Sequence, residues 1–489
     1  MQIFFSKAQL NENKFLILGH LAFFSLFVFS FLLAKERVIF SDSGAQIFEI
    51  IRSKGFEIYV QRFGMYLFQL LPVLAVKLHL PLWAVIYAYS LSLPVIAYCL
   101  WLITVYFLKN QQVGILMLFV MLGIRHTFFH AISETFQLMF LASFLYAWLF
   151  QTRDFQVSVF SKTVYYFVAC LFVALCIFIH PVAIFLVIFI LGLYILNKEI
   201  SILPKVIIFF LSIGVIFLKI LILTTTTGNH DTSFMISVPE FFSRISNIFT
   251  LNSTGWYIGK MGDFYWMPLL MFIISLLFYW KKKKYWHFAF FSCFVILFWV
   301  ITVVIYASGD GAIGMERSFL PLFFLCGIPF VTEVIFTLSS KWDKVFYAGL
   351  VVLLFSGFSK IAVASTPYTQ RLEKIREISA MANQLNKKKI LIEAETAKQI
   401  FPIINWGLGL ESILYSALQG KDLTVNIYIA ESLDSMEEGY LDPEFHFGVP
   451  WWQLWYIDAL NQHYFKLPKQ LPSVLVLEDG QITIKDLSF

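Results

Sequence analysis

The chain of 489 residues is 59% hydrophobic and 19% aromatic, and only 14% of its residues are charged. A soluble domain of this length does not need so much apolar surface, so the composition excludes an ordinary soluble protein and predicts a polytopic membrane protein. The net charge of +5 does not indicate nucleic-acid binding, because the Lys and Arg residues gather in short loops, as a membrane topology requires.

The N-terminus and the cysteines add detail to the prediction of a polytopic membrane protein. The first apolar run, at 15–34, is long enough to span a bilayer and lacks a small-residue cleavage site, which predicts a retained signal anchor. All five cysteines lie in apolar runs and none forms a CxxC pair, so we expect small core residues without a disulfide or a metal site. They are Cys99, Cys170, Cys176, Cys293 and Cys326.

Apolar runs that could cross a membrane recur along the first three quarters of the chain. They fall at about 15–34, 63–80, 82–107, 112–124, 134–151, 164–180, 181–197, 206–224, 264–280, 285–307, 318–338 and 343–363. The four lysines at 281–284 are the strongest orientation mark, and the excess of Lys and Arg in cytoplasmic loops predicts that they are cytoplasmic.

One run must fail to cross if both ends of the chain are to give the same topology. Lys7 and Lys14 predict a cytoplasmic N-terminus, and the lysines at 281–284 predict a cytoplasmic loop. The two predictions agree only if one of the apolar runs between them does not cross the membrane. The run at 63–80 is the best candidate, because it is short and is broken by Pro72. We therefore predict that it lies along the outer surface or dips in and returns. About eleven crossings remain, with the N-terminus in the cytoplasm and the C-terminus outside.

The composition changes abruptly after Ser365, where helical and strand-like patterns begin to alternate. The sequence predicts helices at 368–385 and 403–418, strands at 389–393 and 423–429, and a hairpin at 473–485 that turns at Asp479-Gly480. We expect an all-α polytopic membrane domain over 1–365, with a first outer loop at 35–81 that carries juxtamembrane helices. A small α/β extracytoplasmic domain then follows over 366–489. The sequence contains no glycine-rich nucleotide loop, which argues against an ATP-driven pump.

The most informative single residue is Asp42, which follows the first apolar run and precedes a short amphipathic stretch at 45–52. That stretch predicts a helix lying in the membrane interface. Asp42 could simply cap this helix, because Asp is preferred at N-caps. A carboxylate at the mouth of a membrane segment is otherwise unfavourable unless it faces water or a polar ligand, so a functional role is the alternative.

The polar residues that are hardest to explain fall on the same predicted outer side as Asp42. They are Asp42, Glu49, Arg62, Arg125, His126, His130, Glu134, His180, Asp310, Glu316 and Arg317. Ionisable groups at membrane depth usually line a cavity, so a shared outer cavity is the economical interpretation. Arg62 and Arg317 could instead extend to lipid headgroups, and the three histidines could be hydrogen-bonded residues at helix ends. The histidine spacing matches no metal signature.

A carboxylate that faces an outer cavity together with two or three arginines suits one type of chemistry. The carboxylate would act as general base on an acceptor hydroxyl or amine. The arginines would hold the phosphate of a lipid-phosphate leaving group by bidentate charge-assisted hydrogen bonds. The apolar walls would accommodate the lipid tail.

Several local patterns together resemble a known arrangement. Asp42, the stretch at 45–52 and the non-crossing run at 63–80 follow one another; Arg125 precedes Glu134 between two early spans; and a basic residue precedes proline at His180-Pro181. Arg317-Ser318-Phe319-Leu320-Pro321 opens a late span. This order resembles the GT-C superfamily of membrane glycosyltransferases, among them mannosyltransferases and aminoarabinose transferases, which use polyprenyl-phosphate- or polyprenyl-diphosphate-linked sugars. In that family a catalytic Asp lies in the first extracytoplasmic loop.

The resemblance covers about 1–365 and implies an inverting hexosyl- or pentosyltransferase of the bacterial cytoplasmic membrane. Asp42 would be its catalytic base. Its partners would be a lipid-linked sugar donor, membrane lipids and a cell-envelope glycan, lipid or protein acceptor, with no nucleic acid. The implied substrate-binding residues are Glu49, Arg62, Arg125, His126, His130, Glu134, His180, Glu316 and Arg317. Ser43 stands where many members carry a second acidic residue, so the identity of the base and the need for a divalent metal stay open, and no cofactor is assigned.

Three other functions are open to a chain of this composition. A transporter or lipid flippase would predict two-fold repeat symmetry and charges near the midplane, and the sequence has neither. A glycan polymerase or ligase with arginines in a large outer loop fits poorly, because the loop at 225–263 holds only Arg244 and Lys260 as cations. A non-enzymatic envelope scaffold is the third. The aromatic stretch at 445–456 could stack on sugars, but we favour a belt that seats the C-terminal domain on the bilayer.

Overall fold

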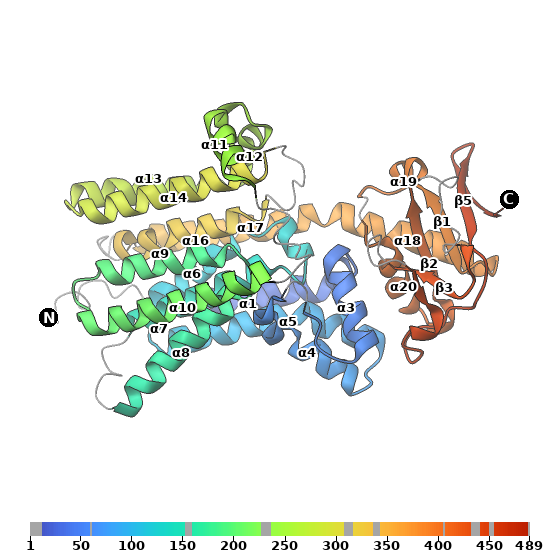
Figure 1. Cartoon of the computed structure of the whole chain (residues 1–489), viewed down its shortest axis with the longest axis horizontal. Helices are drawn as coiled ribbons and strands as arrows, with labels where there is room; N and C mark the ends of the chain where they lie inside the picture. Colours follow the sequence, from blue (N-terminus) through green and yellow to red (C-terminus); the bar gives the residue numbers. More distant parts are fainter. Residues whose placement is uncertain are drawn as a thin grey trace.

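The structure is a computed structural model that describes residues 12–58, 61–151, 159–225, 236–307, 316–335, 343–403, 406–431, 441–448 and 454–487. A bundle of apolar helices forms one part of the molecule, and a small sheet with its own helices forms the other (Figure 1). Asp310 and the segment 449–453 of the aromatic stretch lie outside the described residues. The coarse prediction of a helical region with candidate membrane-spanning helices, followed by a small C-terminal sheet region, is therefore confirmed.

The bundle helices coincide with the apolar runs of the sequence. They are α1 (Glu12–Leu32), α5 (Leu82–Leu102), α6 (Gln111–Met121), α7 (Glu134–Phe150), α8 (Val159–Ile177), α9 (Ala183–Leu196), α10 (Ile202–Thr225), α13 (Trp266–Lys281), α14 (Tyr285–Ile305), α16 (Phe319–Pro329) and α17 (Asp343–Ala364). π-Helical turns extend α5 over Ile103–Phe107 and α16 over Phe330–Val334. The predicted runs at 164–180 and 181–197 form two separate helices, with a break at His180-Pro181.

The number of membrane crossings is smaller by length than the sequence predicts. Among the described residues, five helices are long and apolar enough to cross: Lys14–Leu32, Leu82–Phe107, Ile202–Thr225, Tyr285–Ile305 and Lys344–Gln384. A sixth would result if α12 (Asn252–Asp263) and α13 form one span, although they are bent by 86°. Six more apolar helices have 10–17 residues, and at about 1.5 Å per residue these fall short of a hydrocarbon core about 30 Å thick. The predicted count of eleven is not confirmed.

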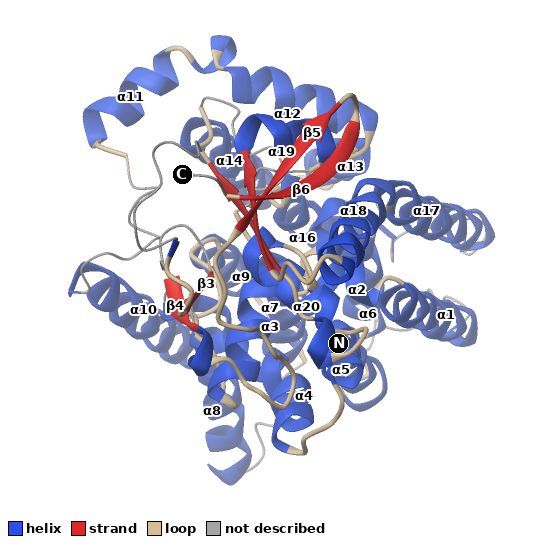
Figure 2. Ribbon diagram, turned by 90° about the vertical axis from the view of Figure 1, so that its right-hand side faces the viewer, coloured by secondary structure: helices blue, strands red, loops and turns tan. Residues whose placement is uncertain are grey.

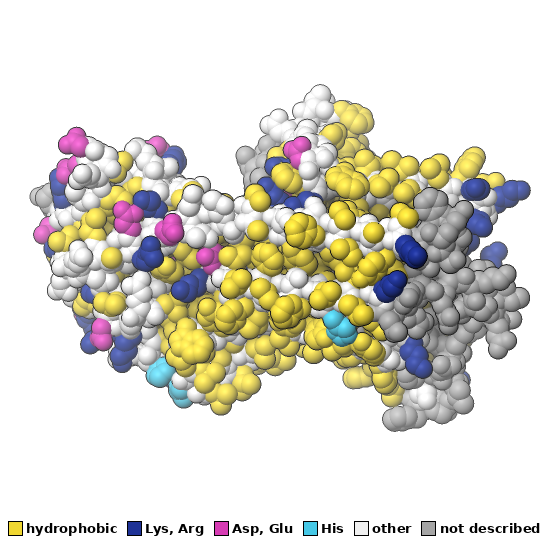
Figure 3. Space-filling model, turned by 180° about the vertical axis from the view of Figure 1, so that it is seen from behind, with side chains coloured by type: hydrophobic (Ala, Val, Ile, Leu, Met, Phe, Trp, Pro, Cys, Tyr) yellow, Lys and Arg dark blue, Asp and Glu magenta, His cyan; other side chains and the backbone are white. Residues whose placement is uncertain are grey.

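The surface of the bundle is strongly apolar, as expected for helices that could span a membrane. Large apolar side chains cover its middle, while Lys and Arg gather at the end far from the C-terminal region (Figure 3). Phe24, Phe210 and Phe217 are each at least 65% exposed, although they sit in the centres of apolar helices. Cys99 and Cys293 are exposed on the same surface, so the expectation that all cysteines lie in the core is wrong for these two. The helices that carry Cys99 and Cys293 are apolar on all sides, so a cysteine within an apolar run need not be buried in the protein.

Three short helices lie at the end of the bundle that faces the C-terminal region, here called the domain-facing end (Figure 1). They are α2 (Ala34–Val38), α3 (Ser41–Ser53) and α4 (Tyr66–Lys77). The predicted amphipathic helix at 45–52 is longer than expected and includes Asp42. α4 is too short to cross a membrane alone, which agrees with the prediction that 63–80 does not cross. The shorter helices of the bundle have the same property, so the length of α4 does not distinguish it from them.

The C-terminal region is a small sheet with helices on it. Its elements are α18 (Thr366–Gln384), β1 (Lys389–Glu393), α19 (Ala394–Ile400), α20 (Leu408–Ala417), β2 (Asn426–Ala430), β3 (Phe445–Phe447), β4 (Leu454–Tyr456), β5 (Ser473–Glu478) and β6 (Gln481–Asp486). The strand order is β2-β1-β5-β6, with β1 parallel to β2 and β5, and with β6 antiparallel. The predicted hairpin is confirmed: Glu478 pairs with Gln481 across Asp479 and Gly480, whose φ angles of 49° and 78° suit a two-residue turn.

The two regions are joined by a helix and by a shared core. α17 and α18 are nearly continuous over Lys344–Gln384, so the predicted boundary at 365 falls within a helix and stays a prediction. One hydrophobic core fills the bundle, and a second combines apolar residues of α3, α4 and the C-terminal sheet. In the end-on view, the sheet and α20 lie over α3 and the end of the bundle (Figure 2).

Aromatic stacking joins the C-terminal region to α3 through β4, which pairs with β3 in a separate two-stranded sheet. The ring of Phe48 on α3 stacks on Trp455 at 5.7 Å between centroids and on Phe465 at 5.5 Å. The guanidinium of Arg52 lies 5.1 Å from the Trp455 ring centroid. The described part of the aromatic stretch therefore contacts protein, and our preference for a bilayer-seating belt is wrong for Trp455. The sequence could not indicate this, because a ring packs equally well on lipid and on a helix.

Candidate functional site

Asp42 lies in the first turn of α3, where the chain leaves the bundle and bends into the helix. The N-cap is Phe40, an extended residue whose side chain makes no cap hydrogen bond, so Asp42 is not the cap that a local interpretation suggested. Ser41 between them has a positive φ of 47°. A carboxylate in the first helical turn is favoured by the helix dipole, and Asp42 remains partly exposed.

The start of α3 rests against the turn between α6 and α7. The Ser43 hydroxyl accepts a hydrogen bond from the backbone N–H of Ile132 at 3.1 Å. The Phe40 ring meets the His130 ring edge-on, with 5.3 Å between centroids. These two contacts bracket Asp42 in the sequence and hold it beside the segment that carries His130 and Glu134.

Arg62 reaches this position through a close approach of two backbones. It precedes a 3-10 turn at Phe63–Met65 whose Gly64 N–H donates to the carbonyl oxygen of Phe178 at 3.1 Å. A Cβ on Gly64 would lie 2.4 Å from the carbonyl oxygen of Leu175, so only glycine fits there. The guanidinium of Arg62 then contacts the carboxylate of Glu134 at 2.5 Å.

Six of the sequence-predicted residues meet around Glu134 and Tyr89; we call them the polar cluster. They are Asp42, Arg62, His130, Glu134, His180 and Arg317. Glu134 is close enough to Arg317 and His180 to interact electrostatically with both. The buried Tyr89 hydroxyl interacts in the same way with Asp42 and Glu134. The expected convergence on one end of the bundle is therefore present for these six residues.

Arg317 is the least satisfied cation of the polar cluster. Its side chain makes no hydrogen bond and no ion pair within 4 Å with any residue that the structure describes, and its Nε is buried. It nevertheless lies near Glu134 and His130. A guanidinium presents five N–H donors in a planar fork, so Arg317 keeps the capacity to bind an anion.

His130 is buried and equally unsatisfied. It is 5% exposed, and neither ring nitrogen has a hydrogen-bond partner among the described residues. Burial, followed by the nearby Arg317 cation, lowers the pKa of His130 to about 3. The ring is therefore neutral near pH 7 and offers one donor and one acceptor, which a polar ligand could satisfy.

The depressed histidine pKa values predict how stability changes with pH. The pKa of His130 is about 3, and burial likewise lowers that of His446 in the C-terminal region to about 4. The unfolded chain binds protons at both residues below about pH 6.5, whereas the folded chain does not, so this contribution is complete above pH 6.5 and is lost as the pH falls. Each residue should contribute about 2 kcal/mol of stability loss between pH 6.5 and 5.

Thermal unfolding in detergent from pH 7.5 to 5 tests this expectation. The His446→Asn variant, which leaves the polar cluster intact, should lose part of the pH dependence of the wild-type unfolding temperature. The exposed His463→Asn is the matched control and should retain all of it. Identical pH slopes for the wild-type chain and His446→Asn would contradict the assignment.

Three further predicted residues, Arg125, His126 and Glu316, bind partners next to the polar cluster. Arg125 pairs with Glu316 at 3.4 Å, and its guanidinium carbon lies 3.8 Å from the Phe264 ring centroid. The Tyr265 hydroxyl also donates to Glu316. His126 contacts the hydroxyl of Tyr368 on α18 at 3.2 Å. Because these side chains are mutually satisfied, they tie α13, α16 and α18 together and have less capacity for a ligand than Arg317.

Glu49 does not join the polar cluster. Its carboxylate pairs with Arg52 at 2.6 Å on the same helix, and its contacts among the described residues lead toward Glu57 and away from Glu134. The structure therefore gives no support to a substrate-binding role for Glu49. An i,i+3 pair of this kind is visible in the sequence, since Glu49 and Arg52 share one helix face.

Among the buried charged residues at this end that the sequence analysis missed are Arg37 and Glu411. The Arg37 Nε donates to the carbonyl oxygen of Phe128 at 2.9 Å, and its Nη1 donates to the carbonyl and hydroxyl oxygens of Ser90. Glu411 lies on α20. Neither residue has a distinguishing local pattern, because their partners are far away in the sequence.

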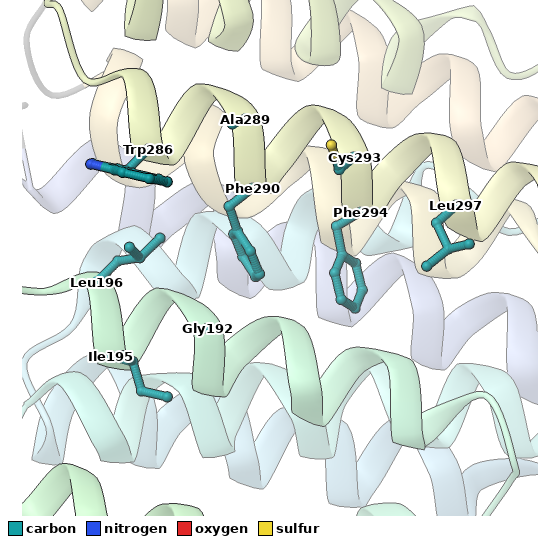
Figure 4. Close-up of a pocket in the computed structure, with 9 residues that line it drawn as sticks. All are labelled: Gly192, Ile195, Leu196, Trp286, Ala289, Phe290, Cys293, Phe294 and Leu297. Carbon is teal, nitrogen blue, oxygen red and sulfur yellow. The ribbon is translucent and has the colours of Figure 1, made fainter.

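An apolar groove lies away from the polar cluster, at the end of α9 opposite His180. It encloses about 510 Å³ between α9 and α14, with Phe290 and Phe294 extending from α14 toward α9 (Figure 4). Its lining is almost wholly apolar, with Gly192 on one side and Trp286 at one end. Apart from the thiol of Cys293, its lining residues are hydrocarbon or aromatic, so the groove suits an apolar ligand.

Within the part of the chain that the structure describes, no three or more His, Cys, Asp or Glu side chains are grouped so that they could hold a metal ion. The polar cluster thus offers two arginines, one carboxylate beside a helix start and one neutral imidazole as its means of binding a ligand. Comparisons of the chain with protein-family models, with curated protein sequences and with solved structures find no match.

Proposed function

We propose that the chain is an integral-membrane glycosyltransferase that transfers a sugar from a lipid-phosphate- or lipid-diphosphate-linked donor to a cell-envelope glycan, lipid or protein. The observation that supports this proposal best is the pairing of two groups at one end of an apolar bundle. Asp42 lies on a short helix at that end, and the cluster beside it contains Arg317, which has no ion-pair partner among the described residues. A base and an anion site next to lipid suit an acceptor and a lipid-phosphate leaving group.

In this proposal each residue of the polar cluster has one task. Asp42 removes the proton from the acceptor hydroxyl or amine as that atom attacks the anomeric carbon, and the lipid phosphate leaves with the electrons of the broken bond. Arg317 donates hydrogen bonds to the leaving phosphate. Glu134 holds Arg62 in place nearby, and the neutral His130 supplies a further donor without adding charge. Attack opposite the leaving phosphate inverts the anomeric centre.

The proposal also assigns the finer topology. α13 begins next to Tyr265, beside the polar cluster, and ends at Lys281, so the lysines at 281–284 lie at the opposite end of the bundle. If those lysines are cytoplasmic, the polar cluster and the C-terminal sheet are extracytoplasmic in a bacterial cytoplasmic membrane. The shorter bundle helices would cross by virtue of tilt, local thinning and their turns, giving about eleven crossings with α4 on the outer surface.

The test is a transfer assay with the full chain in lipid vesicles. A panel of polyprenyl-phosphate-linked hexoses and pentoses is added with a cell-envelope extract as acceptor, and release of polyprenyl phosphate is followed by mass spectrometry. We expect release with at least one donor. Movement of a fluorescent polyprenyl phosphate across the bilayer without release would instead favour a flippase. Binding of polyprenyl phosphate with neither activity would favour a non-enzymatic scaffold.

A further inference from the structure

The backbone just before Asp42 is held in an unusual conformation. Ser41 has a φ of 47°, in the left-handed region that residues with a Cβ adopt infrequently. The chain turns at this residue from the extended Phe40 into α3, so the φ of Ser41 sets the direction in which the first helical turn points. A strained residue persists only where its surroundings over-determine it.

The surroundings of Ser41 include a buried charge pair of the C-terminal region. The Ser41 N–H donates to one carboxylate oxygen of Glu411, on α20, at 2.7 Å. The other oxygen accepts from the Nε of Arg371 at 2.9 Å. Glu411 is 0% exposed and Arg371 is 1% exposed. Arg371 is fixed in turn by donating to the carbonyl oxygen of Ile403.

We infer that Glu411 is a positioning residue, through which the C-terminal region sets the direction of Asp42. Arg371 belongs to α18, which continues α17 out of the bundle, so the pair links the bundle, the C-terminal sheet and the start of α3. The inference rests on the proposed function for its catalytic consequence. The anchoring of Ser41 itself does not depend on any activity.

The pair is better suited to orientation than to stability. Two buried charges lose hydration that their attraction only partly restores, so an apolar pair of the same size would stabilise the fold about as well. An apolar pair would, however, leave the Ser41 N–H without its acceptor. Glu411 is in addition packed closely on α3, because its Cγ lies 3.4 Å from where a Cβ on Gly44 would sit.

Two double variants isolate the acceptor on Glu411. Arg371→Met with Glu411→Gln keeps one side-chain oxygen, which is free to accept from Ser41 because the guanidinium has gone. Arg371→Met with Glu411→Met keeps none. Both leave no buried charge unpaired and lose the contact to Ile403 equally, so the two differ only in the amide group at position 411, whose oxygen is the Ser41 acceptor.

Amide hydrogen exchange of the full chain in detergent is the first readout. We expect the peptide spanning 38–46 to exchange at least 10-fold faster in the Met/Met variant than in the Met/Gln variant, with equal protection of β1 and β2 in both. Equal exchange at 38–46 would overturn the inference, and so would a loss of protection throughout the sheet in the Met/Met variant alone. Should neither variant fold, rapid exchange of Ser41 in the native chain would overturn it equally.

Sugar transfer is the second readout. The Met/Met variant should have a kcat about 10- to 100-fold below that of the Met/Gln variant with an unchanged KM for donor, because a small misplacement of a base costs rate rather than binding. Adding Ser41→Gly to the Met/Met variant should recover part of kcat, since glycine adopts this φ without strain. If the wild-type chain transfers no sugar, the proposed function fails while the exchange result still decides the anchoring of Ser41.

Discussion

Replacing Asp42 by Asn is expected to reduce sugar transfer by about 10²- to 10⁴-fold, the contribution usual for a general base. The substitution is nearly isosteric and removes the negative charge together with the ability to accept a proton. Asp42 is partly exposed and is not the N-cap of α3, so its carboxylate is not needed to start the helix. The unfolding temperature and the affinity for polyprenyl phosphate should therefore stay close to those of the wild-type chain.

The second carboxylate of the same helix provides the control. Glu49 lies about two turns along α3, where its buried carboxylate pairs with the partly exposed Arg52 at 2.6 Å. Glu49→Gln should lower transfer by no more than about twofold, because the weakened contact is a partly exposed ion pair. Purified variants are compared in the polyprenyl-phosphate release assay. If sugar transfer survived Asp42→Asn but was lost in Glu49→Gln, Glu49 would be the general base and our assignment of Asp42 would be wrong.

The convergence of the polar cluster could be predicted from sequence, because it follows from chain direction. Antiparallel apolar helices return to the same two surfaces, so residues at alternate helix ends must lie on one side. Arg62, Glu134, His180 and Arg317 each stand at such an end and do meet. The apolar runs likewise predicted where the bundle helices lie. Their lengths did not predict the crossings, since short helices pack beside long ones in the bundle.

The pairing of the charges could not be predicted, since it depends on contacts between distant segments. Arg125 and Arg317 look alike in sequence, as a cation at a helix end, yet Arg125 pairs with Glu316 and Arg317 makes no such pair among the described residues. Ser41 and Glu411 are 370 positions apart, so neither the left-handed turn nor its anchor leaves a local signal. The sequence therefore indicated where the site lies but not which arginine is available to a ligand.

That difference between the two arginines leads to the second large effect. Arg317→Gln is expected to weaken binding of polyprenyl phosphate by about 10²-fold, because a charge-assisted bidentate contact to phosphate is lost. The affinity of Arg317→Lys for polyprenyl phosphate should lie between those of the wild-type chain and Arg317→Gln, since lysine keeps the charge but not the planar guanidinium. The unfolding temperature of Arg317→Gln should be unchanged or higher than that of the wild-type chain. A partly buried cation without a partner costs hydration in the folded state.

Arg125→Gln should instead lower the stability of the fold and leave phosphate binding nearly unchanged. It leaves the carboxylate of Glu316, which is 3% exposed, without its cation, so the folded chain should lose about 2–4 kcal/mol of stability. Phosphate binding by the protein that remains folded should change little, because Arg125 is already engaged by Glu316 and Phe264. Native mass spectrometry with polyprenyl phosphate and scanning fluorimetry measure the two properties on one preparation. If both arginine variants lost binding to the same extent without a difference in stability, the distinction between a structural and a ligand-binding arginine would be wrong, and the anion would have to lie between them.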